Sequence, residues 1–139
     1  MKKVLYILVV FVAFMACQPE IKGDPDRFKK GTFEIPAGKN YGKTEIKRID
    51  SLHIEKYTRY VEVSTDSGSY TKEVTRTDTL YIKWKNNFSY TLRMKSPKKD
   101  LDKDQIFVQI TKITEDSYDF SARVGYSEFK QTGTVYKVD

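Results

Sequence analysis

The chain of 139 residues contains one cysteine and one histidine. It therefore cannot form an intramolecular disulfide or a metal site built from several histidines. Glycine and proline are scarce, with 7 and 4 residues. The apolar run from Val4 to Ala16 has 13 residues, fewer than the about 20 that a membrane-spanning helix needs. The length allows one domain of ordinary size, which excludes multi-domain machines and large barrel enzymes.

Aromatic residues are abundant, with 10 tyrosines and 8 phenylalanines, and 39% of all residues are apolar. This composition favours a packed domain over a disordered chain. The formal net charge is +6, and the part of the chain that follows Lys2 and Lys3 carries +4. A charge of this size gives only a weak field toward anionic partners such as lipid head groups.

The first 17 residues have the pattern of a bacterial export signal. A pair of lysines precedes the apolar run 4–16, whose length is typical of the hydrophobic region of a signal peptide. The tetrapeptide Phe14-Met15-Ala16-Cys17 resembles the bacterial lipoprotein box, which has a large apolar residue three places before an obligatory cysteine. This resemblance implies that residues 1–16 are removed and that Cys17 is acylated. The alternative is a buried structural cysteine at the end of an N-terminal helix.

Gln18 follows Cys17 at the place where an aspartate retains the lipoproteins of enteric bacteria in the inner membrane. By that analogy we expect an outer-membrane lipoprotein, lipid-anchored and either periplasmic or surface-exposed. The segment 17–29 carries Pro19, Gly23 and Pro25 among alternating charges, which predicts a flexible tether. Residues 30–139 are then a single β domain.

From residue 30 onward, apolar and polar side chains alternate with period two. The clearest hairpin has strands at 80–85 and 88–95 around Asn86-Asn87, because asparagine tolerates the left-handed backbone of tight turns. A second hairpin joins 106–110 to 118–124 through the turn 114–116. Further strands are expected at 31–35, 43–49, 52–59 and 128–138, and a further hairpin joins 60–63 to 70–75 through the turn 65–69.

These strands follow one another without a long stretch of apolar residues at helical spacing, so crossover helices and parallel pairing are not expected. The sequence predicts an all-β fold, an antiparallel meander of about eight or nine strands, rolled into an up-and-down, lipocalin-like or half-open barrel. Lys83, Lys85, Arg93 and Lys95 alternate with apolar positions and would face outward. Membrane-spanning barrels have an apolar outer face instead, so a soluble barrel is favoured.

Patterns for catalysis or metal binding are weak. Asp100, Asp102 and Asp104 match the first three ligand positions of a calcium loop, but Gln105 and Thr111 stand where that loop needs glycine and glutamate. We interpret this cluster as a solvated loop. We therefore expect no metal site and no cofactor.

The only histidine, His53, follows Asp50 and Ser51, but closeness in sequence does not make a catalytic triad. The chain has neither a Gly-x-Ser-x-Gly motif nor a glycine-rich phosphate loop. A lone histidine on a strand is expected at the surface or partly buried. We expect no enzymatic activity.

Five aromatic residues at inward positions form either packed core or the lining of an apolar ligand cavity, because small barrels do one or the other. Large rings more often fill such a space, and packing is the favoured interpretation. The five residues are Trp84, Phe88, Tyr90, Tyr118 and Phe120.

The domain contains five short motifs: Lys30-Gly31-x-Phe33, Asp78-Thr79, Leu80-x-Ile82-x-Trp84, Tyr90-x-Leu92 and Gly133-Thr134-Val135. With the lipoprotein box, they resemble small lipoproteins of Flavobacteria and other Bacteroidota, some of which carry a transferred name of DNA topoisomerase IV. The chain has no nucleotide-binding motif and no room for a cleavage domain, so it does not support that name.

Two further resemblances concern single motifs. The opening Gly31-x-Phe33 is also similar to the first strand of lipocalin-like domains. Asp50-Ser51-Leu52 and Asp78-Thr79-Leu80 resemble the O-glycan acceptor motif of the same bacteria, which implies glycans on Ser51 or Thr79.

The function we expect is that of a non-catalytic outer-membrane lipoprotein that acts in envelope interactions by binding a protein or a glycan. The alternative is a lipocalin-like carrier of a small apolar ligand inside the barrel. Nucleic acid is not an expected partner, because an exported lipoprotein does not normally meet it.

Overall fold

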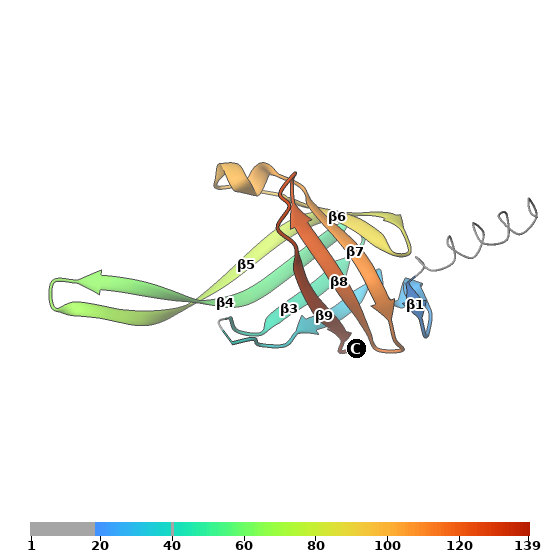
Figure 1. Cartoon of the computed structure of the whole chain (residues 1–139), viewed down its shortest axis with the longest axis horizontal. Coiled ribbons are helices and arrows are strands. Elements are labelled where there is room, and N and C mark those ends of the chain that lie inside the picture. Colours follow the sequence, from blue (N-terminus) through green and yellow to red (C-terminus); the bar gives the residue numbers. More distant parts are fainter. Residues whose placement is uncertain (1–18, 40) are drawn as a thin grey trace, which may run out of the picture.

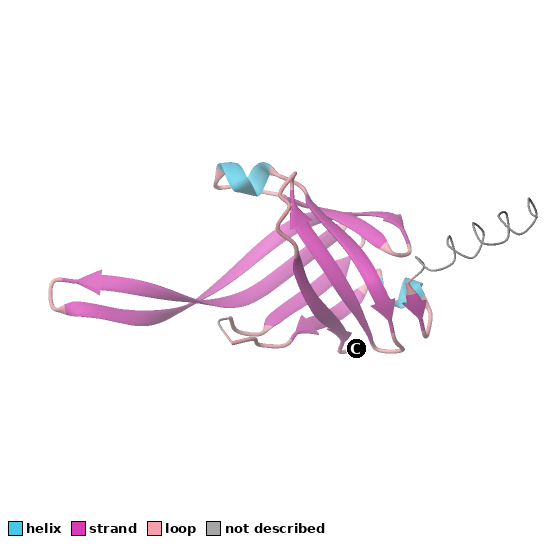
Figure 2. Ribbon diagram, in the orientation of Figure 1, coloured by secondary structure: helices cyan, strands magenta, loops and turns pink. Residues whose placement is uncertain are grey.

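The computed structural model describes residues 19–39 and 41–139, and the predicted signal peptide and Cys17 lie outside these residues. The described chain forms one nine-stranded sheet, and its only helical turns are two short 3-10 helices, η1 (Pro25–Phe28) and η2 (Asp100–Lys103) (Figure 2). The strands are β1 (Glu20–Ile21), β2 (Gly31–Ile35), β3 (Thr44–Ile49), β4 (Leu52–Thr65), β5 (Gly68–Asn86), β6 (Ser89–Met94), β7 (Ile106–Ile113), β8 (Ser117–Val124) and β9 (Gln131–Lys137) (Figure 1).

Strands β2 to β9 close into an eight-stranded barrel. Sequential neighbours pair antiparallel from β2 to β9, and β9 returns to pair with β2. The short β1 is the additional strand, and it runs parallel to the end of β7 at Lys112 and Ile113. That stretch of β7 is open on one side because pairing with β6 stops at Gln109. The all-β antiparallel barrel predicted from the sequence is confirmed.

Inward positions follow the predicted alternation. Lys83, Lys85, Arg93 and Lys95 are exposed, as predicted. The buried apolar core consists of Phe28, Phe33, Ile46, Leu80, Ile82, Tyr90, Leu92, Val108, Ile110, Ile113, Tyr118 and Val135.

Two strands are longer than the sequence pattern predicts. The predicted strands 52–59 and 60–63 are one strand, β4, and the predicted strands 70–75 and 80–85 are both parts of β5. The predicted strands 52–59 and 60–63 are directly adjacent, and two of the four residues between 75 and 80 are threonines, Thr77 and Thr79. Threonine is β-branched and favours extended backbone. The turn between β4 and β5 is confined to Asp66 and Ser67.

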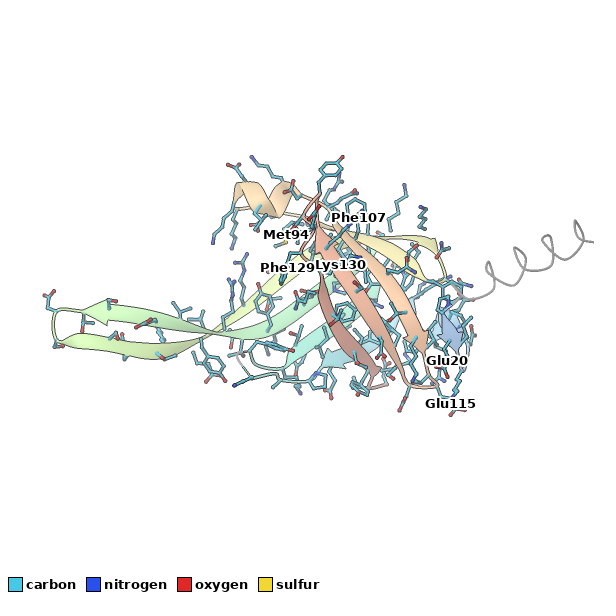
Figure 3. All side chains as sticks on the ribbon, viewed as in Figure 1. Glu20, Met94, Phe107, Glu115, Phe129 and Lys130 are labelled. Carbon is cyan, nitrogen blue, oxygen red and sulfur yellow. The ribbon has the colours of Figure 1, made fainter. Side chains whose placement is uncertain are left out.

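The up-and-down order gives the barrel two different ends. At one end lie the β3–β4, β5–β6 and β7–β8 turns together with η1, and we call it the η1 end. At the other end lie the β6–β7 loop with η2, the β8–β9 loop and the β4–β5 hairpin, which extends well beyond the barrel (Figure 1). We call it the arm end. Glu20 and Glu115 lie at the η1 end, whereas Phe107, Phe129 and Lys130 lie toward the arm end (Figure 3).

The described part of the predicted tether 17–29 packs against the barrel. After β1, the side chain of Asp24 accepts a hydrogen bond from the Asp26 amide at 2.9 Å and caps η1. Phe28, at the end of η1, is fully buried and packs edge-on against Tyr118, with ring centroids 5.2 Å apart. Its prolines, glycine and charges predicted a flexible segment. The burial of Phe28 in the core instead fixes the end of this segment to the barrel.

Candidate functional site

The structure brings together the five aromatic residues predicted to face inward. Tyr90 and Tyr118 are buried, and Trp84, Phe88 and Phe120 are partly buried against the same core. Trp84 and Tyr90 lie 4.6 Å apart between ring centroids. All five contribute to the hydrophobic core or pack against it.

A buried cation, Arg48 on β3, occupies the space between these rings. Its side chain is 2% exposed. Its Nη1 donates to the backbone oxygen of Phe28 at 2.7 Å. Its Nη2 donates to the hydroxyls of Tyr90 at 3.0 Å and Tyr118 at 2.6 Å. The guanidinium thus connects η1 with β3, β6 and β8.

Aromatic faces surround the same guanidinium. Its Cζ lies 4.9 Å from the ring centroid of Phe33 and 5.0 Å from that of Tyr90. Trp84 and Tyr118 lie slightly farther away, at 5.7 and 5.6 Å. Because aromatic faces attract cations, these rings partly replace the water that Arg48 loses on burial.

Arg48 is linked to a negative charge, that of Glu55, through the ring of His53. Arg48 Nε donates to His53 Nδ1 at 3.1 Å, and His53 Nε2 lies 2.7 Å from Glu55 Oε1. The Arg48 bond requires an acceptor at Nδ1, so the proton of neutral His53 is on Nε2 and is donated to Glu55. His53 is 1% exposed, so the expectation of a surface or partly buried histidine was wrong. The buried ring of His53 supplies the hydrogen-bond acceptor for Arg48 Nε.

Burial lowers the pKa of His53 below its usual value, and the Arg48 cation lowers it further, against the opposing effect of Glu55. The folded state therefore keeps His53 neutral at a pH where the unfolded chain, with a histidine pKa of about 6.5, already binds a proton. Stability then decreases as the pH falls below about 6.5, by at most about 1.4 kcal/mol per pH unit.

Urea unfolding at pH 7.5, 6.5 and 5.5 measures this effect. His53 is the only histidine of the chain, so no second histidine contributes to the change in stability. The His53→Gln variant keeps an acceptor for Arg48 and lacks the titrating ring, so its stability should change much less over this range. If the free energy of unfolding changed equally with pH in both proteins, His53 would not be the group responsible.

This buried network stabilises the fold. Guanidinium stays protonated at all accessible pH values, and burial raises the pKa of Tyr90 well above its usual value. Over the described residues, no three His, Cys, Asp or Glu side chains are grouped to hold a metal ion. In the same part of the chain, no helix has the length and apolar character needed to cross a membrane.

The aspartate cluster of the β6–β7 loop shapes that loop. The carboxylate of Asp102 accepts hydrogen bonds from the amides of Lys98 and Lys99, both at 3.1 Å. Asp100 pairs with Lys103 at 2.9 Å. In the proposed O-glycan motifs, Ser51 is exposed and Thr79 is half-buried.

The β4–β5 hairpin is the most exposed regular structure. Pairing of β3 with β4 ends at Tyr57, and pairing of β5 with β6 ends at Leu80. Beyond these points, residues 58–75 form a two-stranded ribbon that projects from the barrel (Figure 1). We call this ribbon the arm.

An ion pair and a phenol fix the base of the arm. The Tyr57 hydroxyl donates to one oxygen of Asp78 at 2.7 Å, and Arg76 Nε donates to the other at 2.9 Å. Burial, together with the bond to Asp78, raises the pKa of Tyr57 to about 12. The base of the arm is therefore held in one geometry while the outer part is solvated.

The arm has two chemically different faces. Directly paired residues share a face of an antiparallel ribbon. One face carries the pairs Arg59–Val74, Val61–Lys72 and Val63–Tyr70, and we call it the apolar-basic face. The other carries Tyr60–Glu73, Glu62–Thr71 and Ser64–Ser69, and we call it the acidic face.

Sequence reasoning missed Arg48. The signal for Arg48 was its position two residues after inward-facing Ile46, in a strand that was correctly predicted. Sequence reasoning predicted a hairpin of strands 60–63 and 70–75, but not that this hairpin continues β4 and β5 and projects from the barrel.

The comparisons with known proteins give no relative. No protein-family model, no curated protein and no solved structure matches this chain. A function must therefore be argued from the geometry described above.

Proposed function

We propose that this protein is a non-catalytic lipoprotein of the outer membrane that binds a protein partner through its arm. The observation that carries the proposal is the exposure of large apolar side chains on a ribbon that no other strand covers. Tyr70 is 54% exposed, Val61 44% and Val74 39%. The lipoprotein box at Cys17 supports the location.

The barrel gains little from the arm. An isolated two-stranded hairpin is at best marginally stable in water, and its unpaired backbone edges are ready to bind another chain. Residues 58–65 of β4 and 68–75 of β5 pair only with each other. An element of this kind is stabilised when a partner covers its apolar side chains.

The charges of the arm indicate the chemistry of the partner. Arg59 and Lys72 lie on the same face as Val61, Val63 and Tyr70. No aspartate or glutamate occupies that face between positions 59 and 74. Complementary charge speeds encounter and excludes wrong partners. The partner is therefore a protein with an acidic surface around an apolar centre.

Site-specific photo-crosslinking in cells tests this function. Val61 and Glu62 are neighbours that face opposite sides of the arm, so a photoreactive residue at each gives a matched pair. We expect one dominant adduct with an acidic protein from position 61 and at least about fivefold less from position 62. Adding Lys72→Glu should weaken the adduct by about tenfold, because it places like charges across the contact.

Three results would contradict the proposal. They are equal adducts from positions 61 and 62, adducts only with lipid, and adducts only with a second copy of the chain. Thermal unfolding of each variant should match that of the parent protein, because the altered side chains are exposed and exposed substitutions change stability by about 0.5 kcal/mol or less.

One observation favours the carrier as a second candidate. The buried indole Nε1 of Trp84 has no hydrogen-bond acceptor among the described residues, and a small ligand with an oxygen atom would supply one. The position of Arg48 beside this ring weighs against it, because the guanidinium and the surrounding phenols occupy the centre of the barrel.

A further inference from the structure

The outer surface of β6, β7 and β8 carries a groove of about 560 Å³. Most of the residues that line it alternate with the buried core, so it lies on the outside of the barrel, and the core residues Tyr90 and Val108 also contribute to its lining. Neighbouring strands contribute Thr91, Gln109, Thr111 and Ser121, which are hydroxyl and amide side chains. Such groups hydrogen-bond sugar hydroxyls as donors and as acceptors.

Three cations line the same groove: Lys85 at the end of β5, Arg123 on β8 and Lys130 before β9. The groove has no aspartate or glutamate in its lining. Among the ion pairs of residues 19–39 and 41–139, none involves these three side chains. Their charges are thus available to a ligand, whereas most of the ion-paired lysines lie elsewhere on the barrel.

Aromatic rings border the groove at the arm end. Phe107 lies under Arg123, with 5.4 Å between the guanidinium Cζ and the ring centroid. Stacking of this kind covers the face of a guanidinium and leaves its N–H edge for an oxyanion. Phe129 directly precedes Lys130, which lines the groove together with Phe107, and is 77% exposed. An exposed ring beside polar groups suits the C–H face of a sugar.

From these three features we propose that the groove binds an acidic saccharide, whose carboxylate, sulfate or phosphate groups pair with Lys85, Arg123 and Lys130. The hydroxyl and amide groups of the groove bind the sugar hydroxyls, and the Phe129 ring packs against a sugar ring. A lone inorganic anion would use the cations only. This site is separate from the arm, and the two proposals can fail independently.

Isothermal titration of the full mature protein with hexagalacturonate, a carboxylated hexasaccharide, tests the inference. Lys85→Gln combined with Lys130→Gln should weaken binding by about tenfold or more, because the double variant loses two charge-assisted contacts with the anionic groups of the saccharide. Phe129→Ala should weaken it by about threefold to tenfold, as expected for the loss of one ring contact. Neutral maltohexaose should bind at least about tenfold more weakly than the acidic hexasaccharide.

The matched control is Lys47→Gln combined with Lys56→Gln. It removes the same charge from exposed positions on β3 and β4 and should change the affinity by less than about twofold, since screened charges at that distance contribute little. Equal weakening by both double variants would overturn the site in favour of net charge alone. Equal affinity for maltohexaose would also overturn it. So would groove-dependent binding to phosphatidylglycerol vesicles without binding to hexagalacturonate.

Discussion

Replacing Arg48 by alanine is expected to lower the free energy of unfolding by about 3–5 kcal/mol, as for other substitutions that break a buried polar network. The change leaves a cavity among the aromatic rings. It also removes the donors that bind Phe28, His53, Tyr90 and Tyr118. Urea unfolding measures the loss.

Two variants show whether position 48 itself is responsible. Lys47→Ala, on the outward face of the same strand, should change stability by about 0.5 kcal/mol or less. Arg48→Met keeps most of the volume and should cost less than alanine, because buried charges can be replaced by apolar groups of similar size at small net cost. A loss below about 1 kcal/mol for Arg48→Ala would mean that the network does not hold the barrel together.

Replacing Cys17 by serine is expected to release the protein from the membrane. A triacylated cysteine buries several tens of CH₂ groups at about 0.8 kcal/mol each, so its loss removes all of the stable anchoring. The variant should be made behind a leader with an ordinary cleavage site, so that the apolar run 4–16 does not itself retain the chain. Fractionation and intact mass measure the effect.

The parent protein should partition with membranes, lack residues 1–16 and carry the mass of acyl chains. The serine variant should be soluble in the envelope and carry none. An unprocessed parent chain in the cytosol would contradict the lipoprotein assignment. A processed serine variant that stays with the membrane would show that acylation is not the anchor.

The sequence predicted the barrel well because its strands are amphipathic and follow one another closely. Ile82 and Leu92, for example, show their inward orientation by alternation with lysine and arginine. Closure between β2 and β9 depends on residues about a hundred positions apart, such as Phe33 and Lys137. A general need to hide sheet edges predicted a closed or half-open barrel, but neither full closure nor the register could be read from one sequence.

The buried network was unpredictable for a related reason. Arg48, Tyr90 and Tyr118 meet only after the barrel has closed, and local composition suggests that an arginine faces water. The groove of β6–β8 needs the same long-range information, since Lys85 and Lys130 come from distant strands. The docking of the segment before β2 was missed for a local reason. Phe28 is a single apolar residue after prolines, a glycine and charged residues, and it is too weak a signal to predict a packed segment.

The docking of β1 and η1 has a consequence for how the protein would stand on a bilayer. β1 begins at Glu20, so an acylated Cys17 lies at most about 11 Å along the chain from the first residue fixed to the barrel. So short a connection would prevent free rotation of the barrel and would keep the η1 end toward the lipid. The arm, whose β4 edge alone runs for eight residues beyond the last β3 pair, or about 26 Å, then points away from the surface. Partners would be met by lateral diffusion at a fixed height above the membrane.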